Sequence, residues 1–255
     1  MNDSVQLQLE GRVATVTIAR EARRNSVDNK TLEQLLEILS SVQQQEISAL
    51  VLTGEGTKAF CAGSDLKALA DYSYAEAKYH TKLFLECTET LEEMHCATIA
   101  AIEGFCFGGG LEIALACDTR IASKESVFGF PEITVGALPT GGGTVSAPRA
   151  IGLARAREML VFGDRVDAAT ALNWGLVGSL VEPGTAFSTA IEKARDYAER
   201  IEPSSIALLK QILIGGYGAP GRTGRTMAYM ADSVLLQRDS FKDGISSFGK
   251  DAVDK

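Results

Sequence analysis

The sequence has no block of lysine and arginine residues, and its acidic residues outnumber its basic ones. Of its 255 residues, 33 are Asp or Glu and 25 are Lys or Arg, so the formal net charge is −8. Proteins that bind nucleic acids usually present a basic stripe or patch to the phosphates. We therefore expect no nucleic-acid partner for this chain.

Long apolar runs are also missing, although 45% of the residues are hydrophobic. The longest apolar stretches fall well short of the roughly 20 residues that a membrane-spanning helix needs. The first residues, MNDSVQLQLEGR, have neither the basic start nor the apolar core of a secretion signal. The composition is that of an ordinary globular protein, and we expect a cytoplasmic location with no membrane partner.

Cysteine and histidine are few, and their positions do not suggest a reactive site. The five cysteines are an odd number without a Cys-x-x-Cys pair, so we expect buried thiols in a reducing compartment. The two histidines, His80 and His95, both lie on or beside one predicted helix. We therefore expect neither a metal site nor a Ser–His pair, and we interpret His95 as a residue at a helix end.

The first part of the chain alternates between strand and helix patterns, which predicts an α/β fold. Residues 5–20 alternate apolar and polar side chains on both sides of a Glu-Gly turn, as β-hairpins do. Apolar spacing and turn residues indicate the elements that follow. Helices are expected over 28–45 and 74–96, and strands over 47–56, 97–104 and 118–123.

After residue 150 the pattern becomes helical, without a linker rich in proline or serine. The helical stretches are 152–163, 167–175, 184–201, 204–216 and 224–237. We expect a core over residues 1–200 that carries the chemistry. Residues 201–255 are expected to form a C-terminal helical region that covers the site or contacts a neighbouring subunit.

Three segments rich in small residues could carry chemistry. They are AFCAGSDLKAL at 59–69, GGGLEIALACD at 108–118 and FGFPEITVGALPTGGGT at 128–144. Each also has an ordinary interpretation: Asp65 as a helix cap, the glycine run as a flexible turn, and Glu132 as a loop carboxylate. The glycines match neither the dinucleotide-binding nor the P-loop fingerprint.

Taken together, the three segments favour one site. Glu112 lies in an apolar run, where a buried and unpaired carboxylate would be costly. Two glutamates that face one cavity could exchange protons with a substrate, and two turns with exposed N–H groups could stabilise an anion. Such a combination suits general acid–base chemistry beside a developing oxyanion.

Nearly the whole chain, roughly residues 5–250, resembles the crotonase (enoyl-CoA hydratase/isomerase) superfamily. The resemblance rests on the three segments above and on RRNSVDNKTLEQL, IEGFCFGGGLEIALACDTRIAS and GDRVDAATALNWGLVGSLVE. It implies a spiral of ββα turns that forms two nearly perpendicular sheets, with a C-terminal helical region. It also implies a homotrimer or homohexamer that binds acyl-CoA thioesters, with coenzyme A as part of the substrate and no separate cofactor.

The resemblance also implies roles for particular residues. The backbone N–H groups of Ser64 and Gly109 would form the oxyanion hole, and Glu112 and Glu132 match the two glutamates of the hydratase subgroup. Further substrate contacts are expected from Ala62, Asp65, Leu66, Lys67, Phe107, Phe130, Thr140 and Arg24. The two phenylalanines would either shape the acyl pocket or fill the core.

The reaction that the resemblance implies for these residues is the reversible addition of water across the C2=C3 bond of a trans-2-enoyl-CoA. Other members of the superfamily share the fold and differ in chemistry. An enoyl-CoA isomerase, a specialised 3-hydroxyacyl-CoA dehydratase and a non-catalytic acyl-CoA-binding protein therefore remain open alternatives at this point.

Overall fold

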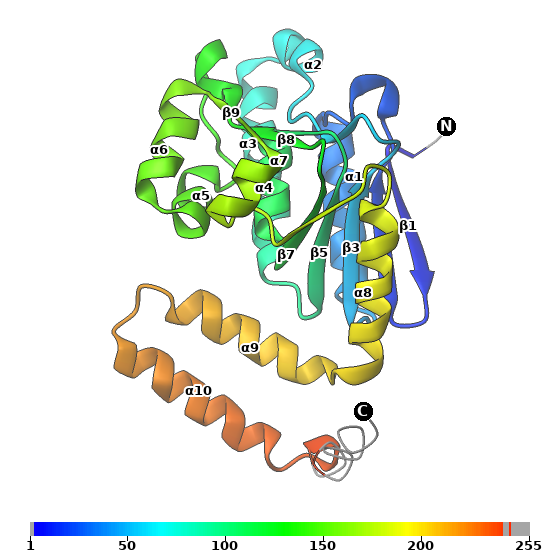
Figure 1. The fold of residues 1–255 in the computed structure, drawn as a ribbon, viewed down its shortest axis with the longest axis vertical. Coiled ribbons are helices and arrows are strands. Elements are labelled where there is room, and N and C mark those ends of the chain that lie inside the picture. Colours follow the sequence, from blue (N-terminus) through cyan, green and yellow to red (C-terminus); the bar gives the residue numbers. More distant parts are fainter. Residues whose placement is uncertain (1–2, 242–244, 246–255) are drawn as a thin grey trace.

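The computed structural model describes residues 3–241 and residue 245. Within this part of the chain the strands form two mixed sheets, with six strands in the larger and four in the smaller. Helices surround both sheets, and two further helices extend from the core at the C-terminal end (Figure 1). The α/β fold with a helical C-terminal region that the sequence predicts is confirmed.

The larger sheet begins with the predicted N-terminal hairpin. Its first two strands pair antiparallel, and every later pair of neighbours is parallel. The order across the sheet is β1 (Val5–Glu10), β2 (Val13–Ile18), β3 (Ala49–Gly54), β5 (Ala97–Ile102), β7 (Thr119–Ser123) and β10 (Ser179–Val181).

Three strands of the smaller sheet directly follow strands of the larger one, and the fourth, β9, follows a helix. β4 follows β3, β6 follows β5, and β8 follows β7, and a helical segment comes after each pair. This repetition is the ββα spiral that the resemblance implies. The order across the smaller sheet is β4 (Ala59–Cys61), β6 (Phe105–Phe107), β8 (Val127–Gly129) and β9 (Arg165–Asp167).

The larger sheet is covered by apolar side chains on both faces, as near-continuous apolar strands require. In β3, Leu50 and Leu52 join the core cluster that contains the leucines of α1, whereas Val51 joins a second cluster with the alanines of α8. Alanines at every fourth position of α8 allow this helix to lie close to the sheet (Figure 1). The helices around the sheets are α1 (Asn29–Val42), α3 (Tyr74–Glu92), α4 (Gly109–Ala116) and α8 (Ala186–Arg200).

Shorter helical segments lie at the edges of the core and connect its strands. They are the 3-10 helices η1 (Glu21–Arg23) and η2 (Pro131–Val135), and the α-helices α2 (Leu66–Asp71), α5 (Gly143–Ile151), α6 (Leu153–Phe162) and α7 (Ala168–Trp174). None of the helices in the described part of the chain is both long enough and apolar enough to cross a membrane.

The C-terminal helices α9 (Pro203–Gly216) and α10 (Gly221–Leu235) pack against each other, and α9 lies between the core and α10 (Figure 1). They follow α8, which ends at Arg200. Large apolar side chains remain exposed on both, including Leu213 at 61% and Tyr229 at 75%. The expected C-terminal region also includes residues 242–244 and 246–255, which lie outside the described residues.

The structure contains elements that the sequence pattern did not predict. The strands β4, β6, β8, β9 and β10 have only three residues each, too few for apolar alternation to be recognised. The β-favouring stretch 133–135 forms part of the 3-10 helix η2, because Pro131 starts a helical turn; Ile133 and Val135 are exposed and do not pair in a sheet.

Candidate active site

The first turn of the candidate site connects β4 to α2. Gly63 adopts φ +91°, a conformation that favours glycine. Asp65 then starts α2, because its carboxylate accepts hydrogen bonds from the N–H groups of Lys67 and Ala68 at 3.2 and 3.4 Å. Its other oxygen pairs with Arg20 at 3.1 Å. Asp65 is therefore a helix cap that also holds the turn in place.

The second turn connects β6 to α4 and lies against the first. A Cβ atom on Gly110 would lie 2.2 Å from the carbonyl oxygen of Cys61, so only glycine allows this approach. A Cβ atom on Gly63 would lie 3.4 Å from the nitrogen of Gly109. The two glycine-containing turns, 45 residues apart in sequence, thus lie side by side at the carboxyl ends of the parallel strands β4 and β6.

Two backbone N–H groups at this junction donate no hydrogen bond in the described structure. Within the described part of the chain, no acceptor is found for the N–H of Ser64 or for that of Gly109, the first residue of α4. The N-terminus of a helix carries a partial positive charge. A thioester carbonyl that gained negative charge at this point would be stabilised by both donors and by the helix.

Glu112 lies in the first turn of α4 and is only 4% exposed. Its Oε1 accepts a hydrogen bond of 2.7 Å from the N–H of Gly143, at the start of α5. Burial raises the pKa of Glu112, whereas the amides of Gly143 and Gly141 lower it. The apolar run tolerates this carboxylate because the glycine-rich turn 141–143 supplies the hydrogen bonds that water would otherwise supply.

Glu132, on η2, lies close to Gly108 of the same junction. A Cβ atom on Gly108 would lie 2.9 Å from its Oε1, and its Oε2 is buried without a hydrogen-bond partner in the described structure. Burial first, and the charge of Glu112 to a smaller extent, raise the pKa of Glu132 to about 7. A carboxyl group with this pKa can both donate and accept a proton near neutral pH.

A cavity of about 540 Å³ lies between these elements, a volume typical of small-ligand sites. The residues singled out from the sequence that line it are Ala62, Ser64, Leu66, Gly109, Glu112, Glu132 and Thr140. The structure adds an apolar wall that the sequence did not indicate, formed by Leu69, Ala77, Phe84, Val135, Ala137 and Leu138. The cavity therefore joins a polar end with two carboxyl groups to an apolar chamber.

The other residues singled out from the sequence are not among those that line the cavity. Lys67 is exposed on α2, and Arg24 lies 5.3 Å from the centre of the Phe105 ring. Phe107 stacks on Phe105 with the ring centres 5.2 Å apart. Phe130 is fully buried, and its ring lies close to the backbone of Gly143. Phe130 thus touches the site only through the turn that holds Glu112.

The expectation of no Ser–His pair was wrong. His80 Nε2 lies 2.9 Å from Ser64 Oγ, and His80 Nδ1 lies 2.7 Å from the side-chain oxygen of Asn29. These residues come from α3, the first turn and the start of α1. Their separations in sequence match no short motif, so only the fold brings them together.

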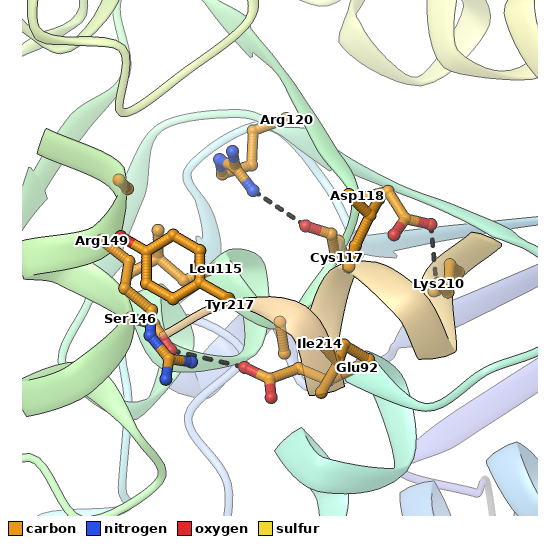
Figure 2. A pocket seen from close by; sticks show the side chains of 13 residues that line it. Glu92, Leu115, Cys117, Asp118, Arg120, Ser146, Arg149, Lys210, Ile214 and Tyr217 are labelled. Atoms are coloured by element: carbon orange, nitrogen blue, oxygen red, sulfur yellow. Dashed lines mark hydrogen bonds and ion pairs between the residues drawn. The ribbon is translucent and has the colours of Figure 1, made fainter. Parts of the chain in front are cut away.

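A second cavity, of about 320 Å³, lies where α9 rests on the core (Figure 2). Lys210 of α9 pairs with Asp118 at 3.0 Å, and Arg149 lies 5.0 Å from the centre of the Tyr217 ring. Its described lining includes neither the two glycine-containing turns nor Glu112 and Glu132. We therefore place the candidate active site in the larger cavity.

Known proteins with similar sequences are enzymes that act on CoA thioesters, by the names they carry. The sequence profile described as enoyl-CoA hydratase/isomerase matches residues 8–251. The chain is 37% identical over 250 residues to (E)-benzylidenesuccinyl-CoA hydratase of Thauera aromatica, covering 96% of each chain. It is 32% identical over 247 residues to the short-chain-enoyl-CoA hydratase of Clostridium acetobutylicum, covering 96% of this chain and 94% of the relative.

A solved structure shows the same fold over nearly the full length. The crystal structure of enoyl-CoA hydratase from Bacillus anthracis superposes with a TM-score of 0.93 at 32% identity. The match covers 97% of this chain and 96% of that structure.

Proposed function

The chain belongs to the enoyl-CoA hydratase/isomerase family and is an enoyl-CoA hydratase-like enzyme, and we propose that it adds water reversibly to the C2=C3 bond of a trans-2-enoyl-CoA. One observation carries this proposal: the buried Glu112 and the half-buried Glu132 line the same cavity as two backbone N–H groups without an acceptor in the described structure. The reaction uses coenzyme A as part of the substrate and needs no separate cofactor.

The thioester oxygen accepts hydrogen bonds from the N–H groups of Ser64 and Gly109. As water adds at C3, negative charge moves to this oxygen, where the donors at the start of α4 stabilise it. The side chain of residue 64 is not needed for this role, because its backbone N–H is the donor.

Glu112 and Glu132 divide the proton transfers. Glu112, which is held by the Gly143 N–H at 2.7 Å, orients the water and accepts a hydrogen bond from it. Glu132, whose pKa is about 7, gives its proton to C2. The proton that the water loses returns to the carboxyl pair, so the enzyme is restored and the product carries one hydroxyl group at C3 and one new hydrogen at C2.

The lining of the cavity favours an apolar acyl chain of modest size. Leu69, Phe84 and Leu138 contribute apolar walls, and a volume of about 540 Å³ accommodates a short aliphatic or a phenyl-bearing chain. The names of the two relatives, a short-chain enoyl-CoA hydratase and an (E)-benzylidenesuccinyl-CoA hydratase, cover both kinds of chain.

The coenzyme A end of the substrate is proposed to leave the cavity past Ala62 toward Lys67 and Arg24. Ala62 lines the cavity, and the two basic side chains lie on the elements next to it. Asp65 contributes through its cap of α2, and Phe130 through its packing against the turn of Gly143.

We also propose that the enzyme is a homotrimer or a pair of trimers, with residues 201–255 as the region that meets a neighbouring copy. The exposed apolar side chains of α9 and α10, such as Leu213 and Tyr229, support this proposal, since a large apolar patch is unusual on a monomer. Light scattering after size-exclusion chromatography gives the mass directly; a monomer of 27.1 kDa would refute it. A cytoplasmic location is proposed from the five free, buried thiols.

The test of the proposed reaction is the loss of enoyl absorbance when crotonyl-CoA is added. Glu112→Gln should lower the hydration rate by about 10²–10⁴, because it removes a positioned acid–base group. Glu125→Gln, an exposed glutamate outside the cavity lining, is the matched control and should keep the parental rate. Migration of a double bond without gain of water would favour an isomerase instead, and Glu112→Gln at the parental rate would refute the mechanism.

A further inference from the structure

The hydroxyl group of Ser64, which hydration does not use, ends a chain of three side chains. Ser64 Oγ lies 2.9 Å from His80 Nε2, and His80 Nδ1 lies 2.7 Å from Asn29 Oδ1. The amide nitrogen of Asn29 donates to the carbonyl oxygen of Glu76 at 3.3 Å, so its oxygen faces the imidazole. Nδ1 therefore carries the proton, and Nε2 is left to accept the hydroxyl proton of Ser64.

The surroundings of His80 keep its imidazole neutral and fixed. His80 is 4% exposed. The centre of its ring lies 5.1 Å from that of Phe84, in an edge-to-face arrangement, and 6.0 Å from that of Tyr72. Burial lowers the pKa of His80 to about 4, although the nearby carboxylate of Asp28 acts in the opposite direction. A neutral imidazole held between two partners is the form that can take a proton from a hydroxyl group.

Ser64 combines this hydroxyl group with the backbone N–H that faces the thioester oxygen. Both Ser64 and His80 line the cavity of about 540 Å³. A serine that supplies a nucleophilic oxygen, while its own N–H and one from a second turn hold the carbonyl oxygen, is an arrangement that performs acyl transfer on unrelated folds. Asn29 occupies the third position, where it orients the imidazole.

From this geometry we infer that Ser64 is a nucleophile toward the thioester carbon of bound acyl-CoA, so that the same cavity also cleaves the thioester. The inference rests on the proposed function, because the carbonyl oxygen has to bind to the N–H groups of Ser64 and Gly109. It extends that function to saturated acyl-CoA thioesters, which have no C2=C3 bond for water to enter.

The reaction balances with water as the only co-reactant. Ser64 Oγ forms a bond to the thioester carbon while His80 Nε2 takes the hydroxyl proton. The carbon–sulfur bond breaks, and His80 returns that proton to the departing coenzyme A thiol. Water then attacks the acyl carbon of the ester on Ser64 and gives a proton to His80 Nε2. The bond between that carbon and Ser64 Oγ breaks, and His80 returns the proton to Ser64 Oγ, so the products are a free carboxylic acid and the regenerated hydroxyl group.

Butyryl-CoA separates this activity from hydration, because it carries no double bond. We expect free coenzyme A, measured by chromatography, to appear faster with the enzyme than by spontaneous hydrolysis. Ser64→Ala and His80→Ala should each reduce this release by about 10²–10⁴. Ser41→Ala, an exposed serine on α1, is the matched control and should release coenzyme A at the parental rate.

The results distinguish the two proposals when the same preparations are given crotonyl-CoA. Hydration of crotonyl-CoA without release from butyryl-CoA would overturn the Ser64 inference and leave the proposed function standing. Release of coenzyme A from butyryl-CoA without hydration of crotonyl-CoA would overturn the proposed function and leave the Ser64 inference standing. Release that persists in Ser64→Ala would also overturn the inference, because a water activated by Glu132 would then be the nucleophile.

Covalent labelling tests the nucleophile without turnover. A fluorophosphonate reagent transfers its phosphorus group to activated serines, so peptide mass spectrometry should find the label on Ser64 in the parental enzyme. Labelling should fall strongly in His80→Ala. An unlabelled Ser64, or equal labelling in His80→Ala, would refute activation by the imidazole.

Asn29 acts in this scheme as a positioning residue, and two variants examine that role. Asn29→Ala should lower kcat for butyryl-CoA cleavage more than it changes KM, because the substrate does not contact Asn29. Asn29→Asp should restore most of the loss, since a carboxylate oxygen also accepts the Nδ1 proton. Failure of Asn29→Asp to restore the activity would contradict the orienting role.

Discussion

Replacing Glu132 with glutamine keeps the shape of the side chain but removes the proton that we propose it exchanges. In the parental enzyme, burial raises the pKa of Glu132 from its usual 4.5 to about 7, and its Oε2 has no hydrogen-bond partner in the described structure. A carboxyl group whose pKa is raised in the folded state destabilises the fold once it has to be charged. Glu132→Gln should therefore lose activity and gain stability together.

The expected loss of activity and gain of stability in Glu132→Gln can both be given a magnitude. Loss of a positioned proton donor lowers the rate by about 10²–10⁴, which corresponds to about 3–5 kcal/mol in the barrier. A pKa rise from 4.5 to about 7 corresponds to about 3 kcal/mol of folding stability. Below about pH 4.5 the carboxyl is protonated in both states and costs nothing. The cost grows as the pH rises toward 7, is complete above it, and is absent in the variant.

Two measurements on the same preparations test this reasoning. Crotonyl-CoA hydration, followed by enoyl absorbance, should fall by at least about a hundredfold in Glu132→Gln. The free energy of unfolding, from urea titrations, should be higher in the variant at pH 8 by up to about 3 kcal/mol and equal to the parental value near pH 4. A variant that hydrates at the parental rate would show that the carboxyl group of Glu132 is not the proton donor. A variant that is less stable than the parental enzyme at pH 8 would show that charging this carboxyl group does not destabilise the fold.

Three further predictions follow from the geometry of the site. Gly109→Ala would place a Cβ atom 2.3 Å from the Phe84 ring, so the ring or the turn has to shift; we expect the N–H of residue 109 to be displaced and hydration to fall by about 10²–10³, and an unaffected rate would contradict this displacement. The proposed mechanism needs a protonated Glu132 as the donor to C2, so kcat/KM for hydration should fall as the pH rises through about 7, and a flat profile from about pH 6 to 9 would contradict that role. Asp65→Ala removes the cap of α2 and the partner of Arg20, so urea titration should show a loss of about 1–2 kcal/mol in unfolding free energy; a stability equal to the parental value would refute the capping role.

The sequence by itself determined the class of the fold, the order of the main elements and the pair of glutamates. These features depend on local patterns: alternation in the hairpin, leucine spacing in α1, and glycines beside Glu112 and Glu132. Such patterns extend over at least one turn of helix or several residues of strand, so they can be recognised without knowing the neighbours. The positions of the two glutamates are also part of the resemblance to the family.

The tertiary structure decided what each of those side chains contacts. Glu112 is tolerated because Gly143, thirty-one residues away, donates to it, and the raised pKa of Glu132 comes from burial that no local pattern reveals. The chain of Asn29, Ser64 and His80 spans fifty-one residues, so a search for short motifs had no signal for it. Hydrogen bonds and burial act over a few ångströms in space whatever the separation along the chain, and only the folded arrangement of the two turns and α3 makes those distances short.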